Sequence, residues 1–303
     1  MSARPMNPTA PPSADLLPRV VAWGAVIGGT VPEIIWREFG HPISLWRTGA
    51  ESLLILLAAL AAIWVPSLRK VARFLIAISI LYFAWRYLSP TLIALPAVGA
   101  VTDHVSWGER LFLNRTFTLS GAVLVTVTLI GSGITRRDLF LCKGNLSAPA
   151  QPIPFLGLRK AVSWAWLGPA VIVVFAAILA PYLYLTVYPN FKAGARIARI
   201  FPWILAVATL NAASEEFQFR SMLLAHLRGA FRPGENILLT AAFFGLNHYY
   251  GQPSGPVGVL MAGAAGWIWA RSMIDTRGGL WAFLIHMTQD IVILTFLAVG
   301  AGM

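Results

Sequence analysis

Long apolar stretches separated by short polar breaks follow one another along almost the whole 303-residue chain. A transmembrane helix needs about 20 predominantly apolar residues, and tilted or irregular helices depart from that length. The pattern therefore predicts nine spanning segments: Val20–Trp36, Ser52–Pro66, Val71–Leu88, Phe117–Ile134, Ser163–Val187, Ile200–Leu224, Ile237–Tyr250, Val257–Met273 and Gly279–Val299. The stretch Pro90–Val101 is also apolar, but it is short and Pro96 interrupts it. We interpret it as a loop or a re-entrant piece.

The composition agrees with a membrane protein. Hydrophobic residues make up 57% of the chain and charged residues only 12%, about half the charged share of a soluble domain. The mean hydropathy is +0.70. We therefore predict an all-α, polytopic transmembrane bundle of about eight or nine helices. Residues 19–303 would form a single membrane domain, preceded by a disordered tail (residues 1–18) that lacks the apolar core of a signal peptide.

The formal charge of +11 does not indicate a nucleic-acid partner, because basic residues cluster in short breaks between apolar segments. Examples are Arg69-Lys70, Arg136-Arg137 and Arg159-Lys160. Short basic loops of this kind are typical of the cytoplasmic side of a membrane protein. The lipid bilayer is thus the expected partner, and no nucleic acid is expected.

The same loops predict an orientation. If Pro90–Val101 does not cross the membrane, the basic loops Ser67–Lys70 and Thr135–Val162 fall on one side. That side should be cytoplasmic, which places the N-terminus in the cytoplasm as well. The lone Cys142 excludes an intrachain disulfide and a paired-cysteine metal site.

Six ionisable residues lie within or beside the apolar stretches of the C-terminal third. Charged and imidazole side chains are costly in hydrocarbon and usually face a cavity or one another. The pattern therefore predicts a buried polar site, with its core at about residues 200–295. The six residues are Glu215, Glu216, Arg220, His248, His286 and Asp290.

The helical spacing of the first three residues divides the two carboxylates. Glu216 and Arg220 are four residues apart, with the acid first, which is the favourable order for an ion pair on a helix. Glu215 is rotated by about 100° from Glu216 and cannot share that geometry. We expect the arginine to hold Glu216, leaving Glu215 free to act on water or a metal.

The two histidines have helical partners as well. His286 and Asp290 are four residues apart, so Asp290 could orient the imidazole or hydrogen-bond a reacting oxygen. Phe244 and His248 have the same spacing, and we expect the phenyl ring to pack one turn from the imidazole.

Several standard hydrolase signatures are absent from the sequence. It contains no HExxH motif of zinc peptidases, and no convincing GxSxG or Ser–Lys pattern. Each polar motif taken alone also has a structural explanation, such as a salt-bridged helix end or an interfacial histidine. A hydrolase built from these residues would use Glu and His to activate water instead of a protein nucleophile.

The order of the three motifs resembles the CPBP family of intramembrane proteases, also called Abi, which includes the CAAX prenyl endopeptidases. The motifs are Glu215-Glu216-x-x-x-Arg220, Phe244-x-x-x-His248 and His286-x-x-x-Asp290. They cover roughly residues 210–291, and residues 1–160 carry no matching signature.

The resemblance implies an intramembrane endopeptidase with defined residue roles. Glu215 would be the catalytic carboxylate that activates water, and Arg220 would brace Glu216. His248 and His286 would position the water or stabilise the oxyanion. Glu215, His248 and His286 could also bind Zn²⁺ with an open fourth position, whereas the same residues can run a metal-free mechanism.

The third motif ends in Asp290, where the prenyl-protein enzymes of the family have Asn. An amide donates a hydrogen bond to an oxyanion, whereas an ionised carboxylate cannot. This favours a bacterial-type member in the inner (cytoplasmic) membrane, with a peptide or membrane-protein substrate whose prenylation is open.

Two other classes of function fit the same residues. A non-catalytic relative, such as a scaffold or an immunity protein, would use the motifs for structure or peptide binding. A proton-coupled transporter would use the acids and histidines as a proton relay.

Overall fold

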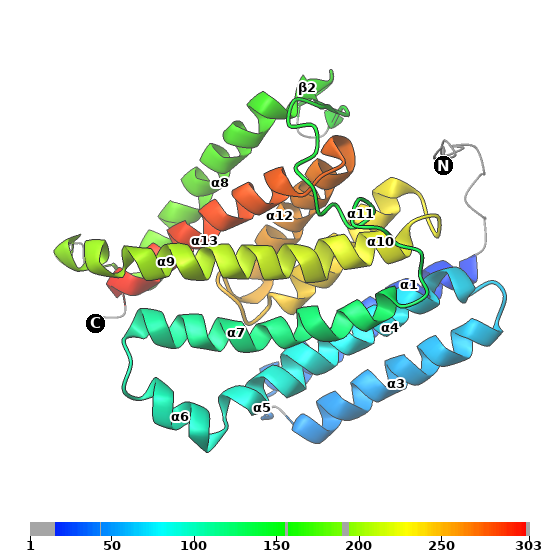
Figure 1. Cartoon of the computed structure of the whole chain (residues 1–303), viewed down its shortest axis with the longest axis horizontal. Coiled ribbons are helices and arrows are strands. Elements are labelled where there is room, and N and C mark those ends of the chain that lie inside the picture. Colours follow the sequence, from blue (N-terminus) through cyan, green and yellow to red (C-terminus); the bar gives the residue numbers. More distant parts are fainter. Residues whose placement is uncertain (1–15, 43, 155–156, 190–193, 301–303) are drawn as a thin grey trace.

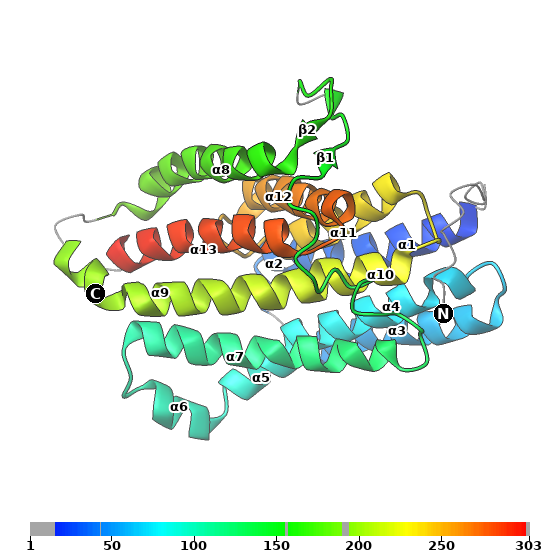
Figure 2. The same ribbon diagram turned by 45° about the horizontal axis from the view of Figure 1, so that its top comes forward.

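A helical bundle makes up almost all of the structure (Figures 1 and 2). The computed structural model describes residues 16–42, 44–154, 157–189 and 194–300. Apart from the helices, the described chain contains one two-stranded antiparallel sheet, β1 (Pro149–Ala150) with β2 (Val162–Ser163). The predicted class, an all-α polytopic transmembrane bundle, is confirmed.

Within the described residues, seven helical segments are long and apolar enough to cross a membrane. They are Trp46–Trp64, Arg69–Ile93, Trp107–Leu129, Trp164–Val187, Ile197–Leu227, Gly255–Thr276 and Leu280–Gly300. The corresponding helices are α3 (Leu45–Trp64), α4 (Arg69–Phe83) with α5 (Ser89–Ile93), α7 (Trp107–Val125), α8 (Trp164–Val187), α9 (Gly194–Glu215) with α10 (Leu223–Leu227), α12 (Gly255–Thr276) and α13 (Leu280–Gly300).

Two shorter helices complete the bundle. α1 (Leu16–Gly28) has 13 residues and α11 (Pro233–Asn247) has 15, so each is only about 20 Å long at 1.5 Å per residue. α11 lies between two spanning segments along the chain. It connects α10, which ends the span Ile197–Leu227, to α12, which forms the span Gly255–Thr276. A helix shorter than the bilayer can make this connection where protein and a cavity surround it.

The predicted span Val20–Trp36 is wrong, because α1 is followed by a separate short helix, α2 (Val31–Glu38). The break is at Gly29, where a Cβ atom would lie 2.5 Å from the ring of Tyr82. The Tyr82 hydroxyl group also hydrogen-bonds the Thr30 side chain at 2.8 Å. α1 begins at Leu16, inside the predicted tail, and residues 1–15 lie outside the described residues.

The predicted span Phe117–Ile134 begins too late. α7 starts at Trp107 and continues through a 3₁₀ turn, Thr126–Leu129. Ser106 and Glu109 form a capping box at its start, with the Glu109 carboxylate accepting from the Ser106 amide at 2.8 Å. Hydropathy alone excluded the first half of α7 because that half carries polar side chains.

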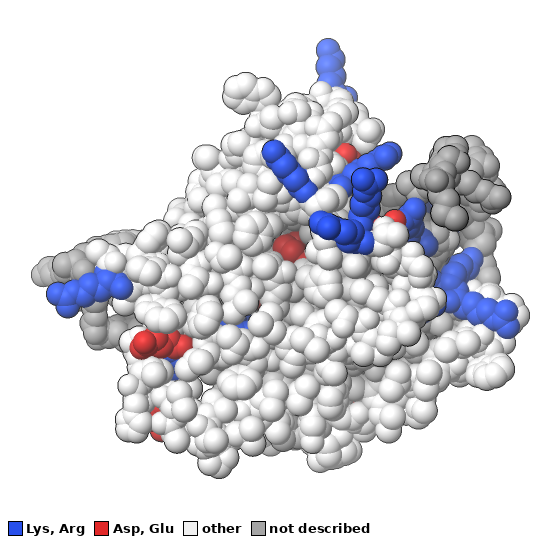
Figure 3. All heavy atoms as spheres, in the orientation of Figure 1, with Lys and Arg blue, Asp and Glu red and all other residues white. Residues whose placement is uncertain are grey.

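Pro90–Val101 does not form a span of its own. α4 continues through a π-helical turn (Ala84–Leu88) into α5, and α6 (Pro96–Thr102) is a separate short helix. The preceding and following spans, Arg69–Ile93 and Trp107–Leu129, are therefore consecutive, and the two basic loops lie at the same end of the bundle. Figure 3 shows Lys and Arg gathered over this end, around the β1–β2 hairpin and the ends of α1 and α10.

α9 runs through the middle of the bundle and positions the site. It packs against α7 on one side and α13 on the other, and α13 in turn packs against α8 (Figure 2). α11 and α12 cross closely because Gly245 has no side chain: a Cβ there would lie 2.7 Å from the Val259 carbonyl oxygen. A cluster of buried aromatic rings, including Phe219, Phe243 and Trp269, fills the space beside α9.

Candidate active site

The regular α-helix ends in the middle of the first motif. Glu215 is the last residue of α9, and Glu216 opens a π-helical segment, Glu216–Met222, that continues into α10. Such π-helical turns are rare and occur frequently at functional sites. Both carboxylates are buried, each with 4% of its surface exposed.

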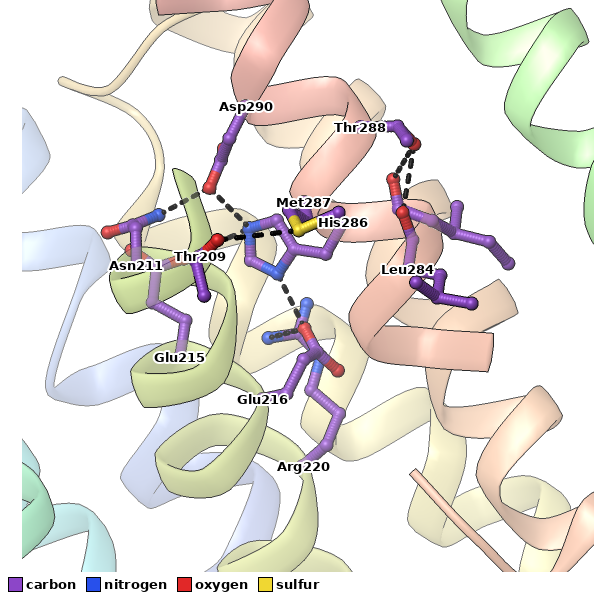
Figure 4. Close-up of polar contacts among 11 residues, drawn as sticks. Thr209, Asn211, Glu215, Glu216, Arg220, Leu284, His286, Met287, Thr288 and Asp290 are labelled. Atoms are coloured by element: carbon purple, nitrogen blue, oxygen red, sulfur yellow. Dashed lines mark hydrogen bonds and ion pairs between the residues drawn. The ribbon is translucent and has the colours of Figure 1, made fainter. Parts of the chain in front are cut away.

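Glu216 is held by two partners (Figure 4). Its Oε1 atom lies 2.7 Å from His286 Nδ1 and 3.5 Å from Arg220 Nη1. The predicted pairing of Glu216 with Arg220 is therefore present. The short contact also makes Glu216 the group that orients the His286 ring, a role that the sequence had left open for Asp290.

Arg220 is completely buried and packs between two aromatic rings. Its guanidinium carbon lies 3.7 Å from the centroid of the Phe244 ring and 4.5 Å from that of Trp269. Gly266 leaves the space that this requires, since a Cβ there would be 3.1 Å from Arg220 Nη2. Cation–π contacts of this kind partly replace the hydration that a buried cation loses.

The ring of His286 presents its second nitrogen to two carboxylates. Its Nε2 atom lies 3.6 Å from Glu215 Oε2 and 3.6 Å from Asp290 Oδ2, as Figure 4 shows for Asp290. The ring stacks on Trp269, with centroids 4.2 Å apart and planes inclined by 10°. The position of Nε2 is thus fixed both by stacking and by the hydrogen bond at Nδ1.

Glu215 and Asp290 differ in how they are held. Asn211, one turn before Glu215 on α9, donates its amide to Asp290 Oδ2 at 2.9 Å. Among the described residues, Glu215 Oε2 is buried without a hydrogen-bond partner. Glu216 Oε2 and the side-chain nitrogens of Arg220 also have no hydrogen-bond partner there, but of these three residues only Glu215 borders the cavity described below.

His248 follows directly after α11. Its ring lies 4.2 Å from that of Phe244, centroid to centroid, and its Nδ1 is 3.3 Å from the Phe244 carbonyl oxygen. The predicted packing of these two side chains is present. The Phe244 ring also contacts His286 edge-on at 6.2 Å, so one phenyl group separates the two imidazoles.

All four of the predicted catalytic residues border one cavity of about 840 Å³. This is within the size range of small-ligand sites. The wall is mostly apolar, and α4, α8, α9, α11, α12 and α13 all contribute to it. α7 and α2 add polar side chains, including Arg115 and Arg37.

Several side chains that hold the candidate site in place were not identified from the sequence. Asn211 could have been, because it is a polar residue one helical turn from Glu215 in an apolar segment. Trp269 and Trp85 carried no such signal. Trp85 donates from Nε1 to Gln218 Oε1 at 2.8 Å and so reaches the π-helical segment from another helix.

The structure does not contain a preformed metal site in the described part of the chain. No group of three or more His, Cys, Asp or Glu side chains there is arranged to hold a metal ion. A metal-binding role for Glu215, His248 and His286 therefore stays a prediction. No step of the mechanism below passes through a metal.

Comparison with known families agrees with the motifs. Residues 197–292 match the family model described as Type II CAAX prenyl endopeptidase Rce1-like. This segment is thus similar to an Rce1-like domain, consistent with the CPBP family that the motifs resemble. This domain begins in α9 and ends in α13, so it contains all six predicted site residues. No curated protein and no solved structure matches the chain.

The family match and the seven apolar helices together describe an integral membrane protein with a protease-type domain. The matched segment is about a third of the chain, and α1 to α8 lie before it. Those helices nevertheless contribute part of the cavity wall.

Proposed function

We propose that this protein is an intramembrane endopeptidase in which Glu215 activates the attacking water. One observation carries the proposal. Glu215 Oε2 is buried without a hydrogen-bond partner at a cavity wall, 3.6 Å from a His286 nitrogen whose ring Glu216 holds. A free carboxylate beside a fixed imidazole, facing a cavity, is the arrangement that general-base hydrolysis requires.

The spacing between the two groups suits one water molecule. Atoms 3.6 Å apart can both hydrogen-bond a single water at about 2.8 Å. Glu215 takes a proton from this water as its oxygen bonds to the carbonyl carbon of the peptide. The carbon–nitrogen bond then breaks, and Glu215 returns the proton to the leaving amine.

The remaining residues support this centre. Glu216 and Arg220 fix the ring of His286, which holds the water beside Glu215. His248 borders the same cavity and stabilises the developing oxyanion. Asp290 is held by Asn211 and bounds the pocket for the scissile bond.

The substrate is a peptide or a membrane-protein segment that enters the cavity within the bilayer. Asp290 in place of Asn does not favour a prenyl-protein substrate. The expected location is the bacterial inner membrane, with the basic loops and the N-terminus on the cytoplasmic side.

The test is cleavage of a peptide library by purified protein in detergent. Glu215→Gln should abolish cleavage while leaving thermal stability near that of wild type, because the substitution is nearly isosteric. Glu38→Gln, an exposed carboxylate at the end of α2, is the matched control and should retain activity. Full activity of Glu215→Gln would remove Glu215 from the mechanism, whereas wild-type protein that cleaves no peptide would favour a non-catalytic relative.

A further inference from the structure

Arg115 is a cationic residue of the cavity wall that lies outside the family-matching segment. It is in the middle of α7, within the spanning segment Trp107–Leu129, and its side chain is half-buried. It borders the same cavity as Glu215 and Asp290. An arginine at such a depth in a membrane usually faces a cavity or a partner.

Two close contacts fix the register of α7 against α9. A Cβ at Gly108 would lie 2.5 Å from Trp203 Cβ, and a Cβ at Gly121 would lie 2.2 Å from Gln218 Oε1. The contacting positions differ by 95 (203 − 108) and by 97 (218 − 121). The two helices therefore run in parallel with nearly constant register between these contacts.

The mean offset of these two contacts is 96 residues, and it places Arg115 of α7 level with Asn211 of α9. Asn211 is four residues before Glu215 on α9, which is a rise of about 6 Å. It also donates to Asp290. Arg115 thus lies about one helical turn from the reacting carboxylate, on the wall of the cavity.

The guanidinium group of Arg115 differs from those of Arg86, which is partly buried, and Arg220, which is fully buried. Arg86 donates to the Gly29 carbonyl at 2.5 Å and to Asn247 at 3.0 Å, and Arg220 is paired as described above. In the described residues, the Arg115 side chain makes neither a hydrogen bond nor an ion pair. Asp290 borders the same cavity, but the structure shows no ion pair between these two described residues.

We propose that Arg115 binds a carboxylate group of the peptide substrate and so determines specificity. This rests on the proposed peptidase function. The guanidinium fork matches a carboxylate in a bidentate geometry, and such charge-assisted pairs are strong in a water-poor site. An extended peptide advances about 3.3 Å per residue. The carboxylate therefore belongs on the order of one to three residues from the scissile bond.

Such a carboxylate has two sources, a free C-terminus or an Asp or Glu side chain. Matched peptides distinguish them in a cleavage assay with purified full-length protein. One pair differs only in a free acid or an amide at the C-terminus, and the other only in Asp or Asn near the cleaved bond. Wild-type protein should prefer the carboxylate-bearing member of one pair in kcat/KM by about tenfold to a hundredfold, as expected for a charged hydrogen bond.

The Arg115→Gln variant should lose this preference. It should cleave both members of the pair at the rate at which wild type cleaves the neutral member, which also shows that the variant is folded. Arg115→Lys should retain part of the preference. The matched control is Arg110→Gln, an exposed residue of the same helix that binds the Thr102 carbonyl oxygen and should keep the full preference.

Two results would overturn the inference about Arg115 but leave the proposed peptidase function intact. Wild-type protein without a preference for either carboxylate would do so. An equal loss on acid and neutral peptides in Arg115→Gln would also do so, because it would mean that Arg115 only offsets the charge of Asp290. If wild type cleaves no peptide of any kind, the proposed function fails and the inference fails with it.

Discussion

Neighbouring carboxylates at residues 215 and 216 have different surroundings. Glu216 is bound to His286 and Arg220, whereas Glu215 Oε2 faces the cavity region without a hydrogen bond among the described residues. Helical periodicity predicted this division, since adjacent residues point about 100° apart. It did not predict that Glu216 would orient His286, because that contact joins residues 70 positions apart.

Removing the Arg220 side chain should destabilise the protein. Arg220→Ala leaves Glu216 as a buried carboxylate without its cation and empties the space between Phe244 and Trp269. Loss of one partner of a buried ion pair costs about 3–5 kcal/mol. We expect a clearly lower melting temperature in detergent. A variant as stable as wild type but inactive would instead place Arg220 at the reacting centre.

Activity should not depend on a bound metal. The described residues contain no preformed group of metal ligands, and the proposed mechanism uses side chains alone, with Glu215 activating the water. Elemental analysis of purified protein should find far less than one equivalent of zinc. Cleavage should continue in the presence of a chelator. Stoichiometric zinc that is lost together with activity, and restored with it, would contradict this prediction.

At the scale of helices, irregular turns and glycines bring the motifs together. The π-helical turn in the α4–α5 segment carries Trp85, which donates to Gln218 in the π-helical turn that follows α9. Gly121 of α7 lets Gln218 approach. Helices outside the matched segment thus hold the catalytic helix in place through specific polar contacts.

The close crossing of α11 and α12 gives a sharp test. In Gly245→Ala, the new methyl group would lie 2.7 Å from the Val259 carbonyl oxygen and 3.0 Å from Gly263 Cα. Backbone cannot give way easily, so α11 must shift, at a cost of about 1–3 kcal/mol. We expect lower stability and lower activity, because His248 follows directly after α11.

Gly49→Ala in α3 is the control for this substitution. It also adds a methyl group to a helical glycine, but nothing lies within 4 Å of the new atom. It should be neutral or slightly stabilising, since Ala favours helix over Gly. If both variants behave alike, the proximity of α11 and α12 does not control the site.

At the scale of the molecule, most of the Lys and Arg side chains visible in Figure 3 lie at one end of the bundle, and a smaller group lies at the opposite end. The single cysteine, Cys142, lies at the more basic end, in the connection between the spans Trp107–Leu129 and Trp164–Val187, and is partly exposed. If this end is cytoplasmic, a membrane-impermeant maleimide should label Cys142 only after cells are permeabilised. Labelling in intact cells would reverse the proposed orientation.

A second single-cysteine protein provides the control. Asp103→Cys in a Cys142→Ser background places the thiol before α7, at the opposite end of the same span. It should react in intact cells. Equal labelling of both proteins under all conditions would mean that the assay does not report sidedness.

The sequence determined the fold class and predicted which residues form the candidate site. Apolar length predicts the spans because the bilayer sets how many residues a helix needs. Charged residues in those spans identify the site because burying them in lipid is costly. Hydropathy was misleading where a helix begins with polar side chains, as in the first half of α7, or where a glycine breaks a helix, as between α1 and α2.

Only the tertiary structure decided how these residues meet. Two contacts join different helices: Glu216 with His286, and the stacking of His286 on Trp269. The position of Arg115 level with Asn211 likewise depends on how two helices pack. Periodicity along one helix fixes which residues share a face. It does not fix the register between helices, which depends on where side chains and glycines allow two helices to approach.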